Sequence, residues 1–135
     1  SHTPLYDRAI VLLGTAIAKA QEFMDNGVVC RTATLIVTDG ADNSSSATPA
    51  KVKKIVEDML RQERHIVAGM GIDDGGMTDF RAVFKGIGIR DEWILTPTNT
   101  PSEIRRAFQV FSRSAVRASQ PAASFSKTAA GGFGT

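Results

Sequence analysis

The chain has 135 residues, of which 42% are hydrophobic, and its formal net charge is +2. This size fits one domain with a single hydrophobic core and excludes two. Because basic and acidic residues are interspersed, the sequence lacks the concentrated positive charge with which proteins neutralise several phosphates, and we expect no nucleic-acid partner.

The first element in chain order is a helix near the start of the sequence. Thr3 is its expected N-cap, Pro4 its first helical residue and Gly27 its stop signal. Between them, apolar residues recur at helical spacing and predict the buried face, which is Leu5, Ala9, Leu12, Leu13, Ala16, Ala20, Phe23 and Met24.

Three short strands follow, and helices separate them. Residues 32–38 are β-branched and apolar on both faces, which is typical of a strand buried in a parallel sheet. Further strands are expected at 65–72 and 92–96. Helices are expected between and after these strands, with N-caps at Thr48 and Thr100. The last of them is expected to bury Ile104, Ala107, Phe108, Phe111 and Ala115.

This alternation of helices and strands predicts an α/β fold, a Rossmann-like parallel sheet with helices on both faces. Ligands of such sheets bind beyond the carboxyl ends of the strands, where Asp39, Asp73 and Thr96 fall. A sheet of three strands is small for this architecture, and it leaves the strand at 32–38 with an unpaired edge.

The composition changes from about residue 119, where Ser, Ala, Gly and Gln predominate. We expect one domain over residues 1–118 and a flexible tail over residues 119–135. The single cysteine, Cys30, cannot form an internal disulfide, and no segment reads as a membrane span or a signal peptide. These features favour a cytoplasmic protein with no membrane partner.

Two segments resemble the later part of a von Willebrand factor type A (vWA) domain. One is Thr-Pro-Leu-Tyr-Asp at residues 3–7, which opens the first helix, and the other is Leu-Ile-Val-Thr-Asp-Gly at residues 35–40, which ends the first strand. The resemblance implies a vWA-like fold from Thr3 to about Ala118. The N-terminal strands of that family, with an Asp-x-Ser-x-Ser loop after the first of them, would have to lie upstream of Ser1.

In that family, residues from three loops hold a divalent cation at a metal-ion-dependent adhesion site (MIDAS). Matching the motifs places the metal-binding threonine at Thr3 and the metal-binding aspartate at Asp39. Mg²⁺ or Mn²⁺ prefers such oxygen ligands, and weak binding is expected because the Asp-x-Ser-x-Ser loop normally supplies three more. The resemblance implies a non-enzymatic binding module whose protein partner offers an Asp or Glu carboxylate to the metal. The N-terminal half of the domain is a further candidate partner.

Other polar residues have simpler interpretations. Residues 42–46 match Asp-x-Ser-x-Ser, but they follow Asp39 in the same loop, so an Asx-rich turn is expected there. Asp73 and Asp74 precede two glycines and are expected to form a solvated turn. His65 is expected at the surface. Asp39 itself has an alternative role, as a turn carboxylate that accepts backbone N–H groups.

Two other functions stay open on the sequence alone. One is a structural or assembly role with a vestigial metal site. The other is a Mg²⁺-dependent phosphotransferase or hydrolase with Asp39 as nucleophile, which would need a second carboxylate nearby and a phosphate clamp. The Asp39 loop has no aspartate two residues away, and the chain lacks the glycine-rich and serine-elbow motifs of nucleotide-binding proteins and hydrolases. We therefore assign no catalytic or cofactor-binding residue.

Overall fold

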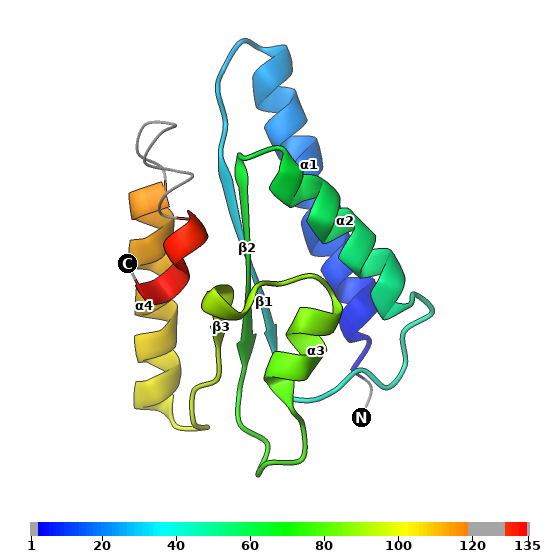
Figure 1. Ribbon diagram of the computed structural model, residues 1–135, viewed down its shortest axis with the longest axis vertical. Helices are drawn as coiled ribbons and strands as arrows, with labels where there is room; N and C mark the ends of the chain where they lie inside the picture. The colour runs from blue at the N-terminus through cyan, green and yellow to red at the C-terminus, as the bar shows by residue number, and fades with distance from the viewer. Residues whose placement is uncertain (1–2, 119–128, 135) are drawn as a thin grey trace.

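Helices and strands alternate through the computed structural model, which describes residues 3–118 and 129–134. The elements in chain order are α1 (Leu5–Asp25), β1 (Thr32–Thr38), α2 (Pro49–Arg61), β2 (His65–Gly71), α3 (Phe80–Gly86), η1 (Asp91–Trp93), β3 (Ile94–Leu95), α4 (Pro101–Ala118) and η2 (Gly132–Gly134) (Figure 1). No helix among these residues combines the length and the apolar character needed to cross a membrane.

The three strands form one parallel sheet in the order β1-β2-β3. β1 and β2 pair over their whole length, with Thr32 opposite His65 and Thr38 opposite Gly71, whereas β3 pairs with β2 only at Ile94 and Leu95. Every residue of β2 is buried, as expected for the central strand of a parallel sheet. The predicted α/β architecture with a parallel, Rossmann-like sheet is therefore confirmed.

Helices cover both faces of this sheet. Figure 1 shows α1, α2 and α3 on one side of the strands and α4 on the other. Thr34, Ile36 and Thr38 of β1 are buried, and Ile36 belongs to the same apolar core as residues of α1 and α2. Since alternate residues of a strand face opposite sides, the intervening β1 residues face the side of α4.

The first helix differs from its prediction in two respects. It begins at Leu5, with Pro4 at the N-cap position, so Thr3 is not the N-cap. Its buried residues are Leu5, Ala9, Leu13 and Ala20, whereas Leu12, Phe23 and Met24 are exposed. The reason is that α1 lies at the margin of the sheet, beside the outer strand β1, and its neighbours cover only one flank.

The later helices and strands agree with the sequence-based prediction in their N-caps and differ from it in strand length and in some buried residues. Thr48 and Thr100 accept hydrogen bonds from the N–H of the third residue of α2 and α4, Lys51 and Glu103, which confirms both as N-caps. The third strand is shorter than predicted, because η1 occupies the residues before it. Phe108 was predicted to be buried but is 43% exposed, and Ser114 and Ala118 are buried instead.

Part of the predicted flexible tail is packed against the domain. Residues 129–134 form a short helical segment, in which Phe133 stacks edge-on against Trp93 with 4.7 Å between ring centroids. The Trp93 Nε1 donates a hydrogen bond of 2.6 Å to the carbonyl oxygen of Ala129. Residues 129–134 of the expected tail thus contact the domain through Trp93, while residues 119–128 and 135 lie outside the described part of the chain.

Glycines of β2 allow α3 to pack closely on the sheet, and this predicts the effect of substitution. A Cβ atom added at Gly69 would lie 2.6 Å from Cδ1 of the buried Phe84, so Gly69→Ala should lower the free energy of unfolding by about 1–3 kcal/mol. Gly14 in α1 has open space, and Gly14→Ala should raise that free energy by about 0.5–1 kcal/mol. Urea unfolding followed by circular dichroism measures both, and equal effects would contradict the packing account.

His65 is 3% exposed rather than at the surface, and it should make stability depend on pH. Its Nδ1 lies 2.6 Å from Thr32 Oγ1, and burial, followed by the charge of Arg64, lowers its pKa below 6.5. Because the unfolded chain binds this proton more readily, the free energy of unfolding should decrease as the pH falls from about 6.5 through the lowered folded pKa. His65→Gln should remove this decrease in urea unfolding measured over that range.

Candidate functional site

The carboxyl end of β1 and the start of α1 lie at the same end of the molecule. Figure 1 shows the loop that leaves β1 running across this end, past the N-terminus of α1, before it enters α2. The loop comprises residues 39–48 and contains both Asp39 and the Asp-Asn-Ser-Ser-Ser segment. Thr3 and Asp39, which are far apart in the sequence, are therefore brought to one region.

Two hydrogen bonds from the backbone of Thr3 hold it to this loop. The Thr3 N–H donates to Asn43 Oδ1 at 2.6 Å, and the Asn43 N–H donates to the Thr3 carbonyl oxygen at 3.1 Å. The four Cα–Cα steps from Asp39 to Asn43 span at most about 14 Å of chain. Asp39 therefore lies within about this distance of Asn43, the residue to which Thr3 is bonded.

The same loop caps the first helix. Asp42 Oδ1 accepts from the Tyr6 N–H at 3.2 Å, and Ser45 Oγ accepts from the Asp7 N–H at 3.0 Å. These are N–H groups of the first turn, which have no partner inside a helix. The loop thus provides the cap that Thr3 was predicted to provide.

Asp7 makes the contact reciprocal. Its two carboxylate oxygens accept from the N–H groups of Ser46 and Ala47, each at 2.9 Å. The start of α1 therefore fixes the loop backbone while the loop fixes the helix end. We call these contacts, made by Thr3, Tyr6 and Asp7 with residues 42–47, the loop–helix lock.

The charge of Asp42 is stabilised within the lock. Burial by itself raises the pKa of Asp42, but hydrogen bonds from Ser45 and from backbone N–H groups at the start of α1 outweigh it and hold that pKa below 3.8. The carboxylate also accepts from the Ser45 N–H, which makes the expected Asx-rich turn. Residues 42–46 are therefore a turn and a helix cap, and the cap is the role that the sequence did not reveal.

Asp39 is outside the lock. It is exposed in a bend directly after β1, and within the described residues no hydrogen bond to its carboxylate is found. The neighbouring Thr38 hydroxyl is occupied, because it donates to the Gly40 carbonyl oxygen at 2.7 Å. The alternative in which Asp39 is a turn carboxylate that accepts backbone N–H groups finds no support in this geometry.

A metal ion at this place would have few protein ligands. Asp7 and Asp42 are engaged by N–H groups, and the part of the chain that the structure describes contains no group of three or more His, Cys, Asp or Glu side chains suited to a metal. The two predicted ligands, the carboxylate of Asp39 and the hydroxyl of Thr3, are not among the groups that form the hydrogen bonds of this loop to the start of α1. Mg²⁺ commonly keeps several water ligands and uses one or two carboxylates, so an ion held by these two oxygens would depend mainly on water.

The other acidic candidates form a local turn, as predicted. Asp73 is exposed, and its Oδ1 accepts from the N–H groups of Gly75 and Gly76 at 3.1 and 3.2 Å. Asp74 accepts from the backbone N–H and the hydroxyl of Thr78, and the hydroxyl bond lowers the pKa of Asp74 below its ordinary value. These carboxylates are satisfied within their own loop.

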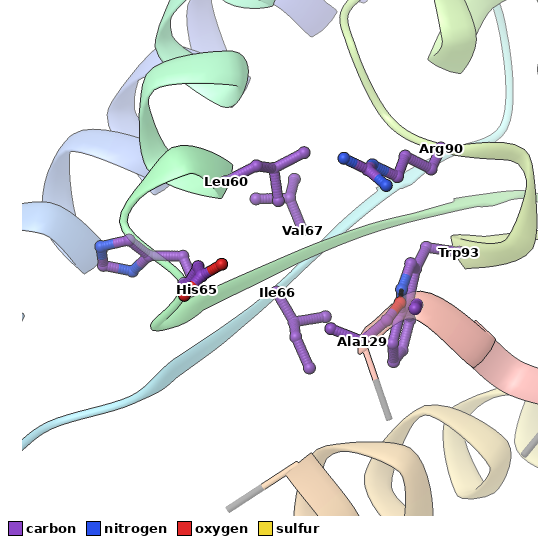
Figure 2. A pocket seen from close by; sticks show the side chains of 9 residues that line it. Leu60, His65, Ile66, Val67, Arg90, Trp93 and Ala129 are labelled. Atoms are coloured by element: carbon purple, nitrogen blue, oxygen red, sulfur yellow. Dashed lines mark hydrogen bonds between the residues drawn. The ribbon is translucent and has the colours of Figure 1, made fainter. Parts of the chain in front are cut away.

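A cavity of about 180 Å³ lies elsewhere, near the beginning of β2. Figure 2 shows Ile66 and Val67 on opposite sides of the β2 backbone and the Trp93 ring beside Ala129. Leu60 adds a further apolar wall, and the Trp93 N–H is already bonded. The cavity contains neither Thr3 nor Asp39 in its lining, and it is separate from the candidate site.

Comparison of the chain with protein-family models, with curated proteins and with solved structures finds no match. The interpretation of the site therefore depends on the residues and contacts described above.

The loop–helix lock predicts a stability effect of Asp42. Asp42→Ala should lower the free energy of unfolding at neutral pH by about 0.5–2 kcal/mol, as loss of a helix cap does. Because the folded pKa is lowered, this contribution is present above the unfolded pKa and should disappear as the pH falls through the folded value. Urea unfolding from neutral into acid pH measures both effects.

Asp39→Ala is the matched control for this prediction. Its carboxylate is exposed and lies outside the lock, so the free energy of unfolding should change by less than about 0.5 kcal/mol. Equal losses in the two variants would contradict the assignment of the cap to Asp42.

Proposed function

We propose that this chain is part of a vWA-like domain that recognises a protein partner through a divalent cation held by Asp39 and Thr3. The observation that carries the proposal is the contrast between Asp39 and its acidic neighbours. Asp7 and Asp42 are engaged in the loop–helix lock, whereas Asp39 is exposed at the carboxyl end of β1. Ligands of parallel α/β sheets bind at this end.

The lock gives the proposed site its geometry. The backbone N–H and carbonyl oxygen of Thr3 are both bonded to Asn43, to its side-chain oxygen and its backbone N–H respectively. The Thr3 hydroxyl is the remaining group that could serve as a metal ligand at the loop–helix junction. Asp39 supplies a carboxylate from the other side of the same loop. Mg²⁺ or Mn²⁺ bound there would offer a Lewis-acidic position to a carboxylate of the partner. With two protein ligands and the rest water, binding by this chain should be weak.

The arrangement favours recognition over catalysis. Phosphoryl transfer from an aspartate nucleophile would need a second free carboxylate and a phosphate clamp. Asp7 and Asp42, the acidic side chains of the lock, instead accept hydrogen bonds from backbone N–H groups. This engagement supports a binding role and gives no support to Asp39 as the nucleophile of a hydrolase.

Paramagnetic Mn²⁺ tests the site without requiring the partner. In an amide NMR spectrum, added Mn²⁺ should broaden the signals of Thr3, Asp39 and Gly40 before those of the rest of the chain. Asp39→Ala should raise the Mn²⁺ concentration needed for this broadening by about tenfold or more, since loss of even an outer-shell residue costs that much.

Asp73→Ala is the matched control, because Asp73 is an exposed aspartate at the end of the next strand whose carboxylate serves its own turn. It should leave the Mn²⁺ response at Thr3 and Gly40 unchanged. If Asp39→Ala and wild type respond alike, the metal site is wrong, and the structural or assembly role becomes the better explanation.

A further inference from the structure

The cavity near the beginning of β2 lies where β3 does not accompany that strand. β3 pairs with β2 only through its own two residues, opposite Gly69 and Met70. Just before β3 the chain forms η1, in which the Trp93 N–H donates to the Arg90 carbonyl oxygen at 2.9 Å instead of joining the sheet. A space of about 180 Å³ is left beside the first residues of β2.

The walls of this cavity are mostly apolar. Ile66 and Val67 are buried and lie on opposite sides of the β2 backbone, and the Trp93 ring forms another wall (Figure 2). Leu60, near the end of α2, and Ala129 add to the lining. An engineered apolar cavity of about 150 Å³ binds benzene. A cavity of about 180 Å³ therefore has room for an apolar group of roughly six to eight carbon atoms.

The Trp93 wall is held in place by the last described segment of the chain. Trp93 Nε1 donates to the Ala129 carbonyl oxygen at 2.6 Å, and the Phe133 ring packs edge-on against the indole. A Cβ atom added at Gly132 would lie 2.2 Å from the Glu92 carbonyl oxygen, so this segment is in close contact with the backbone before Trp93. The cavity is therefore preformed, as small-molecule sites usually are.

One basic side chain extends toward this apolar space without an acidic partner. Figure 2 shows the Arg90 guanidinium directed toward Leu60 and Val67. Arg61 and Arg81 are paired with aspartates, whereas no salt bridge found among the described residues includes Arg90. A guanidinium binds a carboxylate through two parallel hydrogen bonds. Arg90 is therefore suited to hold an acidic group at the cavity.

The surface next to the cavity is positively charged. An adjoining hollow shares Leu60, Glu63 and Arg90 with the cavity and is lined by four basic and two acidic side chains. The basic ones are Lys53, Arg61, Lys85 and Arg90, and the acidic ones are Glu57 and Glu63. Because Glu63 is exposed, water and salt screen its charge. The balance of charge favours an anion at this place.

We propose that this cavity binds a small carboxylic acid, with an apolar group of roughly six to eight carbon atoms inside and the carboxylate on Arg90. The apolar group would contact Ile66, Val67 and the Trp93 ring. The site lies at the amino end of β2, whereas Asp39 follows the carboxyl end of β1. Each of these strands has seven residues, which separates the two ends of the sheet by about 20 Å. Binding at the cavity therefore needs no metal ion.

Phenylacetate is a suitable probe, because its benzyl group matches the cavity and it carries a single carboxylate. Trp93 is the only tryptophan of the chain, so its indole N–H gives one NMR signal. Phenylacetate should shift this signal and the methyl signals of Ile66 and Val67 saturably, with a dissociation constant in the millimolar range or below. Phenylacetamide has the same shape without the charge. It should bind about tenfold more weakly or worse, because hydrogen bonds between charged groups are the stronger ones.

Two arginine variants test the role of the charge. Arg90→Gln should lower the affinity for phenylacetate by about tenfold or more and leave that for phenylacetamide unchanged. Arg90 is exposed, so this change leaves the core intact. Arg61→Gln is the matched control, because Arg61 lines the adjoining hollow but not the cavity and is paired with Asp58. It should bind phenylacetate like wild type.

A third variant tests the cavity itself. Ala129→Leu places a larger side chain in the wall and keeps the backbone carbonyl that bonds Trp93. It should weaken the binding of phenylacetate and phenylacetamide alike, since both need the same apolar space.

Three results would overturn the proposal. The first is the absence of a saturable shift at Trp93, Ile66 and Val67 at phenylacetate concentrations far above millimolar. The second is equal affinity of the wild type for phenylacetate and phenylacetamide. The third is an equal loss of phenylacetate affinity in Arg90→Gln and Arg61→Gln, because the carboxylate would then not be held by Arg90. None of these measurements involves Mn²⁺, so they are separate from the test of the metal site.

Discussion

The reciprocal hydrogen bonds between the start of α1 and the loop after β1 hold the carboxyl end of the sheet together. They join residues 36 to 40 positions apart in the chain, and each side both donates and accepts. Asp42 satisfies N–H groups of the first helical turn, while Asp7 satisfies N–H groups of the loop. A shift of either segment would leave half-buried polar groups, such as the Asp42 carboxylate and the Tyr6 N–H, without their partners, which destabilises the folded state. The lock therefore fixes where α1 meets the sheet and keeps Thr3 beside the loop.

The lock also divides the polar side chains of this region by role. Residues 42–46 have the letters of a metal-binding Asp-x-Ser-x-Ser loop, yet Asp42 and Ser45 serve the helix end. Asp39 precedes Asp42 by three residues and takes no part in these contacts. A carboxylate that accepts several N–H groups is already neutralised by its surroundings, whereas an exposed carboxylate keeps its affinity for an external cation. This difference is the reason to place a ligand site at Asp39 and a structural role at Asp42.

The features that the sequence predicted well depend on local signals. The strands β1 and β2 follow from short β-branched runs, and the starts of α2 and α4 follow from Thr-Pro pairs in which the threonine caps its own helix. The errors concern contacts between distant segments. The cap of α1 comes from a loop nearly forty residues later, His65 is buried by the pairing of β2 with β1, and the packing of Phe133 on Trp93 brings in residues from near the end of the chain. The candidate residue Asp39 could be chosen from a motif, but its availability depends on which neighbours the fold occupies.

Asp39 stands at the carboxyl end of β1, and the loop of the lock begins directly after it. Because Asp42 and Ser45 cap α1 while Asp7 accepts from the N–H groups of Ser46 and Ala47, this loop is held against the start of α1. A partner carboxylate that reaches Asp39 has to approach from a side that the loop leaves open. Loosening the lock would therefore change partner recognition even if Asp39 itself were unaltered, because the position of Thr3 depends on the same contacts.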